Sequence, residues 1–126
     1  MKPYEKLDAW RLVHELALDI YRATTGFPKR ELYGVTAQTR RAALSVPTNI
    51  AEGSAKRGHR EFRRFLDIAI GSLADLSYLL RFAQDLGILP PEDSERLTTQ
   101  RERVGIVTWR LYRSIRDRRP RSSASP

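Results

Sequence analysis

Cysteine is absent from this 126-residue chain, and histidine occurs only twice, as His14 and His59. A chain without cysteine has no disulfide, no thiolate metal site and no cysteine nucleophile. Two histidines are too few for a histidine-rich metal site. The sequence therefore predicts no metal site, no bound cofactor and no catalytic residue of these types.

Long apolar runs are also missing. No stretch approaches the roughly 20 apolar residues that a membrane-spanning helix needs, and the N-terminal residues 1–5 contain no apolar signal core. We therefore expect a cytoplasmic protein with no membrane partner. The length, with 40% hydrophobic and 30% charged residues, fits one globular domain.

Basic residues outnumber acidic ones by 23 to 15, which gives a formal net charge of +8. The excess is concentrated in two segments. Residues 55–64 contain five basic groups against one acid, and residues 96–126 contain nine arginines against two acids, whereas residues 65–95 contain one arginine and six acids. This segregation indicates a polyanionic partner or pairing between faces of an assembly. General solubility of an arginine-rich chain is the alternative.

Apolar residues recur at the three- and four-residue spacing of an α-helix in four segments. We predict helices over about residues 9–24, 35–55, 60–86 and 92–118, joined by short linkers. The predicted fold class is all-α, an up-down-up-down four-helix bundle over residues 1–119. Residues 120–126 form a serine-rich tail that we expect to be disordered.

The first predicted helix has a candidate signal at each end. Asp8 can cap its start, and Gly26 is suited to a left-handed conformation at its end. The predicted core stripe comprises Trp10, Val13, His14, Ala17, Ile20 and Tyr21. We interpret His14 on this face as a core or interface residue.

The second predicted helix contains a proline and a line of polar residues. Pro47 has no amide hydrogen and crowds the carbonyl of Ala43, so the sequence predicts a kink there. Spacings of three and four residues place five polar side chains on one line beside the core stripe. This line is either a binding or catalytic groove or a hydrogen-bonded seam that fixes the register of helices or subunits, and we favour the seam. Its members are Gln38, Arg41, Ser45, Asn49 and Glu52.

The third predicted helix has more apolar surface than one core needs, because a second apolar flank accompanies its core stripe. Surplus apolar surface of this kind is typical of a self-association interface. Gly71 and Ser72 lie in the middle of this helix, where small residues favour close helix packing over ligand binding. The candidate interface residues, including one from the second helix, are Leu44, Ile68, Leu79, Phe82 and Leu86.

A turn at residues 53–59 is followed by a helix start that is rich in positive charge. Positive charge opposes the helix dipole there, which favours an anionic partner. Arg103 and Arg110 belong to a seven-residue repeat with Arg96 on the exposed side of the fourth helix, which we call the ridge. The ridge is either a solvated face or an anion-binding face. We expect phosphate contacts without base readout, and no aromatic stacking, because most aromatic residues lie on core stripes. The candidate nucleic-acid-binding residues are Arg40, Lys56, Arg57, Arg60, Arg63, Arg64, Arg103 and Arg110.

Several short motifs carry a family resemblance, and the most specific is Ser45-Val46-Pro47-Thr48-Asn49-Ile50-Ala51-Glu52-Gly53. The others lie at residues 7–10, 27–28, 31–34, 38, 40–42, 61–62, 65–66, 68–69 and 71–73. In these motifs the chain resembles the bacterial four-helix bundle proteins named for intervening sequences in large-subunit ribosomal RNA genes, over about residues 4–115. The resemblance implies a cytosolic ring, a homopentamer, without known catalytic residues. Related bundles accompany the reverse transcriptases of diversity-generating retroelements.

Three functions follow from these features. We expect a non-enzymatic oligomeric protein that binds structured RNA or DNA. The alternative is a scaffold that docks a protein partner such as a reverse transcriptase. The third hypothesis is an enzyme that uses Glu52 with His14 or His59, and it is disfavoured because no motif pairs a nucleophile with a base.

Overall fold

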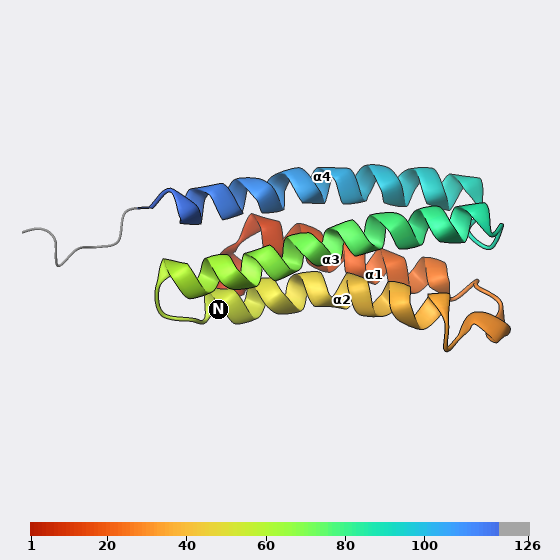
Figure 1. The fold of residues 1–126 in the computed structure, drawn as a ribbon, viewed down its shortest axis with the longest axis horizontal. Coiled ribbons are helices and arrows are strands. Elements are labelled where there is room, and N and C mark those ends of the chain that lie inside the picture. Colours follow the sequence, from red (N-terminus) through yellow and green to blue (C-terminus); the bar gives the residue numbers. More distant parts are fainter. Residues whose placement is uncertain (119–126) are drawn as a thin grey trace, which may run out of the picture.

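The computed structural model describes residues 1–118 and consists of four long α-helices (Figure 1). They are α1 (Asp8–Thr24), α2 (Val35–Ser54), α3 (His59–Asp85) and α4 (Pro91–Arg116). Short 3-10 helices, η1 (Pro3–Lys6) and η2 (Lys29–Glu31), precede α1 and α2. The described residues contain no β-strand, so the predicted all-α class is confirmed. The tail predicted at residues 120–126 lies outside the described residues.

The chain reverses direction at each connection, so that consecutive helices are antiparallel (Figure 1). Helix α1 packs against α2 and α4, and α3 packs against the same two helices, which gives a square bundle. The predicted up-down-up-down topology is therefore confirmed. The α1–α2 and α3–α4 connections lie at one end, and the α2–α3 connection and the end of α4 lie at the other (Figure 1).

One apolar core runs the length of the bundle. Its fully buried side chains come from every helix and include Leu16, Ile50, Leu76 and Leu97. Three buried threonines, Thr24, Thr39 and Thr108, donate their hydroxyls to the carbonyl four residues earlier at 2.6–2.8 Å, so burial leaves these hydroxyls hydrogen-bonded. None of the helices formed by residues 1–118 combines the length and apolar character needed to cross a membrane.

The ends of α1 differ from the prediction. Asp8 is the first helical residue rather than the cap, and its carboxylate pairs with Arg11 one turn later. An acid in this position still complements the positive helix start. Gly26 is not left-handed, because the chain leaves α1 through Thr25 in a right-handed conformation; positive φ angles among residues 1–118 occur at Gly58 and Gly87.

The buried face of α1 is also rotated from the predicted stripe. Leu16 is fully buried, whereas His14 and Tyr21 are exposed. The His14 ring stacks on Trp10 with the ring centroids 4.8 Å apart. Leucine has no polar atom that needs a hydrogen bond, whereas histidine and tyrosine can keep their polar atoms in water. Leu16 therefore faces the core, and His14 and Tyr21 face solvent. His14 is therefore not a core residue of the bundle, and its alternative interpretation as an interface residue stays a prediction.

Helix α2 continues unbroken from Val35 to Ser54 with Pro47 inside it, and the predicted kink is not confirmed. A close contact between α2 and α3 lies near the end of α2. A Cβ atom on Gly53 would lie 2.8 Å from the Phe65 Cβ and 3.0 Å from the Phe62 Cδ1. Close packing was predicted at Gly71 and Ser72. It is wrong for Gly71, which has nothing within 4 Å of its Cβ position, whereas Ser72 is buried and hydrogen-bonded to Ser45 of α2. The glycine that allows close approach is Gly53.

Candidate functional site

A basic cavity of about 630 Å³ lies where the α2–α3 turn meets the end of α4. Helices α3 and α4 are antiparallel and similar in length, so the first turn of α3 lies beside the last turn of α4 (Figure 1). We call this hollow the basic cavity. Its lining residues are Gly58, His59, Arg60, Arg63, Ile115, Arg116 and Arg118.

The charge around the basic cavity is poorly compensated. No acidic side chain from residues 1–118 lines it. Arg60 and Arg63 form no ion pair with any other residue in the described range. Arg116 pairs with Asp117, with its Nε 3.0 Å from the carboxylate. Several guanidinium groups beside one hollow create a positive potential that attracts an anion.

Three further basic residues of the predicted set surround this turn. The Arg64 guanidinium lies 4.6 Å from the centre of the Phe65 ring, and it pairs with Glu61 at 3.3 Å. The Lys56 ammonium lies 5.6 Å from the centre of the same ring. Arg57 is exposed in the turn itself, next to the cavity residue Gly58. Arg57 and Arg64 both lie outside the cavity lining. Arg64 pairs with Glu61, whereas Arg57 forms no ion pair with any other residue among residues 1–118.

Arg40 lies at the opposite end of the bundle. Its Nε donates to the Thr24 Oγ1 at 2.8 Å, and a terminal nitrogen donates to the Tyr21 carbonyl at 3.3 Å. The guanidinium also lies 4.7 Å from the centre of the Tyr21 ring. These contacts fasten α2 to the negative end of the α1 dipole. Phosphate binding by Arg40 stays a prediction, and the structure gives this side chain a role in holding two helices together.

Arg103 and Arg110 are exposed on α4 outside the basic cavity. Their neighbours on the helix are engaged within the chain. Arg96 pairs with Asp93 at 3.2 Å, and Arg101 donates to the Leu73 carbonyl at 3.3 Å. The predicted ridge is therefore spread along α4, and Arg103 and Arg110 do not line the basic cavity.

Two aromatic residues on α4 lie close to Arg116, which lines the basic cavity. Trp109 is 45% exposed and stacks on Tyr112, with ring centroids 5.3 Å apart and an interplanar angle of 13°. The Arg116 guanidinium lies 5.9 Å from the centre of each ring. We did not identify this pair from the sequence, although the spacing of three and four residues from Trp109 to Arg116 places them on one face of a helix.

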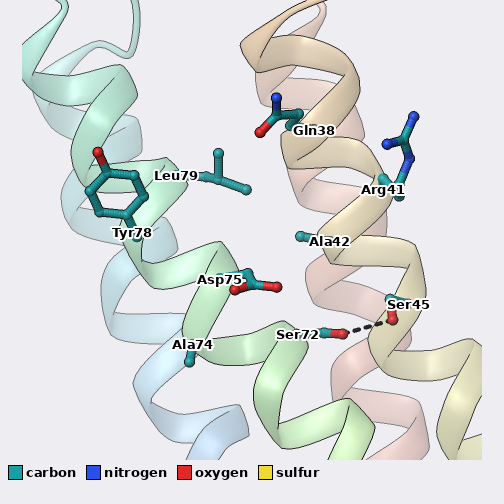
Figure 2. Close-up of a pocket in the computed structure, with 9 residues that line it drawn as sticks. All are labelled: Gln38, Arg41, Ala42, Ser45, Ser72, Ala74, Asp75, Tyr78 and Leu79. Carbon is teal, nitrogen blue, oxygen red and sulfur yellow. Dashed lines mark hydrogen bonds between the residues drawn. The ribbon is translucent and has the colours of Figure 1, made fainter.

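Three residues of the polar line, Gln38, Arg41 and Ser45, line a groove of about 630 Å³ between α2 and α3 (Figure 2). The Ser45 Oγ lies 2.7 Å from the Ser72 Oγ, and this hydrogen bond joins the two helices. The Asn49 amide donates to the Ser45 carbonyl at 2.7 Å and to the Ser45 Oγ at 3.0 Å. Gln38 and Arg41 line the open part of the groove (Figure 2). Part of the line is thus hydrogen-bonded between helices, and part faces solvent.

The apolar flank of α3 borders the same groove. Leu79 lines it, and a smaller hollow of about 270 Å³ beside it is lined by Leu79 and Phe82 together with Gln38. Leu44 lies elsewhere, in a hollow with Tyr33 and Arg40. We call the shared surface the α2–α3 face, and it comprises Gln38, Arg41, Ser45, Asp75, Tyr78, Leu79 and Phe82.

Among residues 1–118, the Glu52 side chain is not paired with His14 or His59, the combinations proposed for an enzyme from the sequence. Within residues 1–118, no hydrogen bond or ion pair joins the Glu52 side chain to a histidine. His14 stacks on Trp10, and His59 lines the basic cavity. The described part of the chain also contains no cluster of three or more His, Asp or Glu side chains that could hold a metal ion.

Comparisons with known proteins place the fold in a family. The 23S rRNA-intervening sequence protein family matches residues 5–108. A solved structure of a protein of unknown function, from the S23 ribosomal protein family of Bacteroides thetaiotaomicron, is similar with a TM-score of 0.74 and 17% identity, over 82% of this chain and 97% of that chain. This likeness shows a shared fold. No curated protein matches the sequence. Because the family match covers most of its length, the chain belongs to the 23S rRNA-intervening sequence protein family.

Proposed function

We propose that this protein is a non-enzymatic, cytoplasmic nucleic-acid-binding bundle whose main contact surface is the basic cavity with Arg57. The observation that supports the proposal is the convergence of arginines from the start of α3 and the end of α4 on one hollow without an acidic lining residue from residues 1–118. A nucleic-acid backbone presents successive phosphates, so it can satisfy several neighbouring guanidinium groups at once. The family name refers to 23S rRNA, which makes a structured RNA the first probe.

The chemistry of the cavity fits phosphate better than a base edge. Each guanidinium offers a planar fork of donors that matches two phosphate oxygens. The volume of about 630 Å³ falls in the range of pockets that hold a small organic molecule. We therefore expect the cavity to hold one or two nucleotides of a longer strand, while Arg57 contacts the phosphates that extend beyond it. Binding of this kind tolerates changes of sequence and weakens with salt.

Two double variants with equal charge test the position of this surface. Arg60→Gln with Arg63→Gln removes two cavity arginines, and Arg103→Gln with Arg110→Gln removes two ridge arginines. Each pair lowers the formal net charge from +8 to +6. We expect the cavity variant to bind a labelled structured RNA about tenfold more weakly at low salt. The ridge variant should stay close to the wild-type affinity.

The comparison has two results that contradict the proposal. Equal losses in both variants would mean that net charge alone drives binding, and a larger loss in the ridge variant would move the site to Arg103 and Arg110. Circular dichroism of each variant verifies that the bundle is intact. All four substitutions lie on exposed or half-buried helix positions, so we expect little change in fold.

Exposed apolar residues favour a second, protein-binding role for the α2–α3 face. Phe82 of this face is 42% exposed. Ile68 and Leu86, which lie 14 residues before and four residues after Phe82 and so continue the same line, are 41% and 49% exposed. We propose that another copy of this chain covers this face in a closed ring, and the family resemblance favours a homopentamer. The alternative function, a scaffold that docks a protein such as a reverse transcriptase, would use the same surface. A purified protein that remains monomeric at high concentration would favour the scaffold.

A further inference from the structure

We propose that Trp109 and Tyr112 form a stacking platform for an unpaired nucleobase at the edge of the basic cavity. The preferred ligand would then be single-stranded RNA or DNA, or an unpaired loop within a structured RNA. This inference rests on the proposed function, because phosphates held in the basic cavity would bring the base to the platform.

The core of the bundle does not require an indole at position 109. The buried residues of this part of α4 are Val104, Thr108 and Ile115, and Trp109 points about 100° away from Thr108. The ring is 45% exposed, so a large apolar surface remains in contact with water. Aromatic rings in this setting are common where a partner supplies the missing cover. Trp109 is therefore available for a contact outside the bundle.

The surroundings of the indole leave room for a base. Tyr112 stacks on one side of it with nearly parallel rings, which holds the indole in a fixed orientation. Helical side chains lean toward the start of their helix, and the residue four positions before Trp109 is Gly105. Within 4 Å, a Cβ atom at Gly105 would meet only the Arg101 guanidinium, at 3.7 Å. No side chain from that position covers the ring.

Arg116 connects the platform with the basic cavity. Its guanidinium lies 5.9 Å from both ring centroids, and the same side chain lines the cavity with Arg60 and Arg63. A nucleotide joins its base to its phosphate through a single sugar. A phosphate bound beside Arg116 would therefore place its base against Trp109.

This arrangement discriminates between paired and unpaired nucleotides. In a duplex the faces of the bases are covered by their neighbours, so an aromatic side chain cannot stack on them without opening the helix. In a single strand each base offers a free face, and stacking on an aromatic residue strengthens binding with little regard to sequence. The basic cavity alone would bind both forms through their phosphates.

Two oligonucleotides with equal numbers of phosphates test the platform. One is a short thymidine single strand, and the other is an abasic strand of the same length. We expect the wild-type protein to bind the thymidine strand about tenfold more tightly than the abasic strand. Trp109→Ala should bind both strands with the affinity of the abasic one, and Trp109→Phe should keep part of the preference. Ile106→Ala, at an apolar residue of the same helix that is 54% exposed, should keep all of it.

The possible results separate this inference from the function on which it rests. If neither strand binds at low salt, both proposals fail. If both strands bind equally and lose affinity with salt, the phosphate site stands and the platform is wrong. A loss of abasic binding in the correctly folded Trp109→Ala variant would show that Trp109 supports the cavity and is not a stacking residue.

Fluorescence gives an independent measurement, because the chain contains only two tryptophans. Replacing Trp10 by Phe leaves Trp109 as the only indole. Stacking of a base on this indole should quench its emission when the thymidine strand binds, while the abasic strand should leave it nearly unchanged. Unchanged emission at saturating thymidine strand would overturn the inference.

Discussion

At the scale of single residues, two glycines within helices differ in the space around their Cα atoms. Gly53 of α2 faces Phe62 and Phe65 of α3 at distances that leave no room for a methyl group. Gly71 of α3 has open space where its Cβ would be. Both residues cost conformational entropy in a helix, but only Gly53 allows two backbones to approach. The consequence of replacing them should therefore differ in sign.

Gly53→Ala should lower the free energy of unfolding by about 1–3 kcal/mol, because the phenylalanines must move to admit the methyl group. Gly71→Ala should raise it by roughly 0.5–1 kcal/mol, because alanine is the better helix former and meets nothing. Urea unfolding at one protein concentration measures both. A change of the same sign in the two variants would contradict the packing described for α2 and α3.

The hydroxyl pair between Ser45 and Ser72 is the other residue-scale feature with a measurable effect. Removing either hydroxyl breaks the 2.7 Å hydrogen bond between α2 and α3, and each single alanine variant should cost about 1 kcal/mol. The double variant should cost less than the two single costs together, because both remove the same bond. Strict additivity in a double-mutant cycle, measured by thermal unfolding, would show that the bond does not couple the helices.

At the scale of helices, length and direction create the candidate site. Helices α3 and α4 contain 27 and 26 residues and run antiparallel, so each begins beside the end of the other. This matching of lengths brings residues that are more than 50 positions apart in the sequence, such as Arg60 and Arg116, to one hollow. A change in the length of either helix would separate them. The site is a property of the helix pair.

Helix positions could be predicted closely from the sequence because apolar periodicity and turn residues act locally. The helix phase was harder to predict, as Leu16 and His14 of α1 show, because the spacing alone does not decide which neighbouring stripe faces the core. The role of Gly53 depends on Phe62 and Phe65 of another helix. Such contacts between elements leave little trace in a local pattern.

The candidate site was predicted only in part, for a similar reason. The cluster that includes Arg60 and Arg63 was visible as a run of charge. The contribution of Arg116 and Trp109 could be predicted only with the antiparallel arrangement of α3 and α4 in hand. That arrangement places the end of α4 beside the basic run. The contacts of Arg40 could not be predicted from its own helix, because the carbonyl and hydroxyl that it contacts belong to α1.

The exposed apolar flank of α3 gives a prediction for the α2–α3 face. Light scattering of the wild-type protein should give a mass several times the 14.5 kDa of one chain. Phe82→Glu should lower that mass, because a buried charge without a partner destabilises an interface. Ile106→Glu introduces the same charge on α4 and should leave the mass unchanged. A wild-type mass equal to one chain, or equal effects of the two variants, would argue against this interface.

At the scale of the whole molecule, the bundle topology places two basic parts of the sequence together in space. The basic segment at residues 55–64 and the end of α4 occupy one end of the bundle (Figure 1). The α3–α4 connection occupies the other end, where Arg81 pairs with Asp85 and Arg96 pairs with Asp93, so positive charge there is compensated. A molecule with one positive end orients a polyanion before contact and accelerates its association. The charge pattern therefore supports the cavity as the place of first contact.

The dependence of nucleic-acid affinity on salt tests this account most directly. With phosphates bound by Arg57 and the four arginines of the basic cavity, log Kd should change with log salt concentration with a slope of about 3.5 for a single strand. Raising the salt from about 50 to about 200 mM should then weaken binding on the order of a hundredfold. The measurement is a fluorescence titration of the wild-type protein with a labelled RNA at each concentration. No binding at the lowest salt, or an affinity that does not change with salt, would contradict the proposed nucleic-acid-binding function.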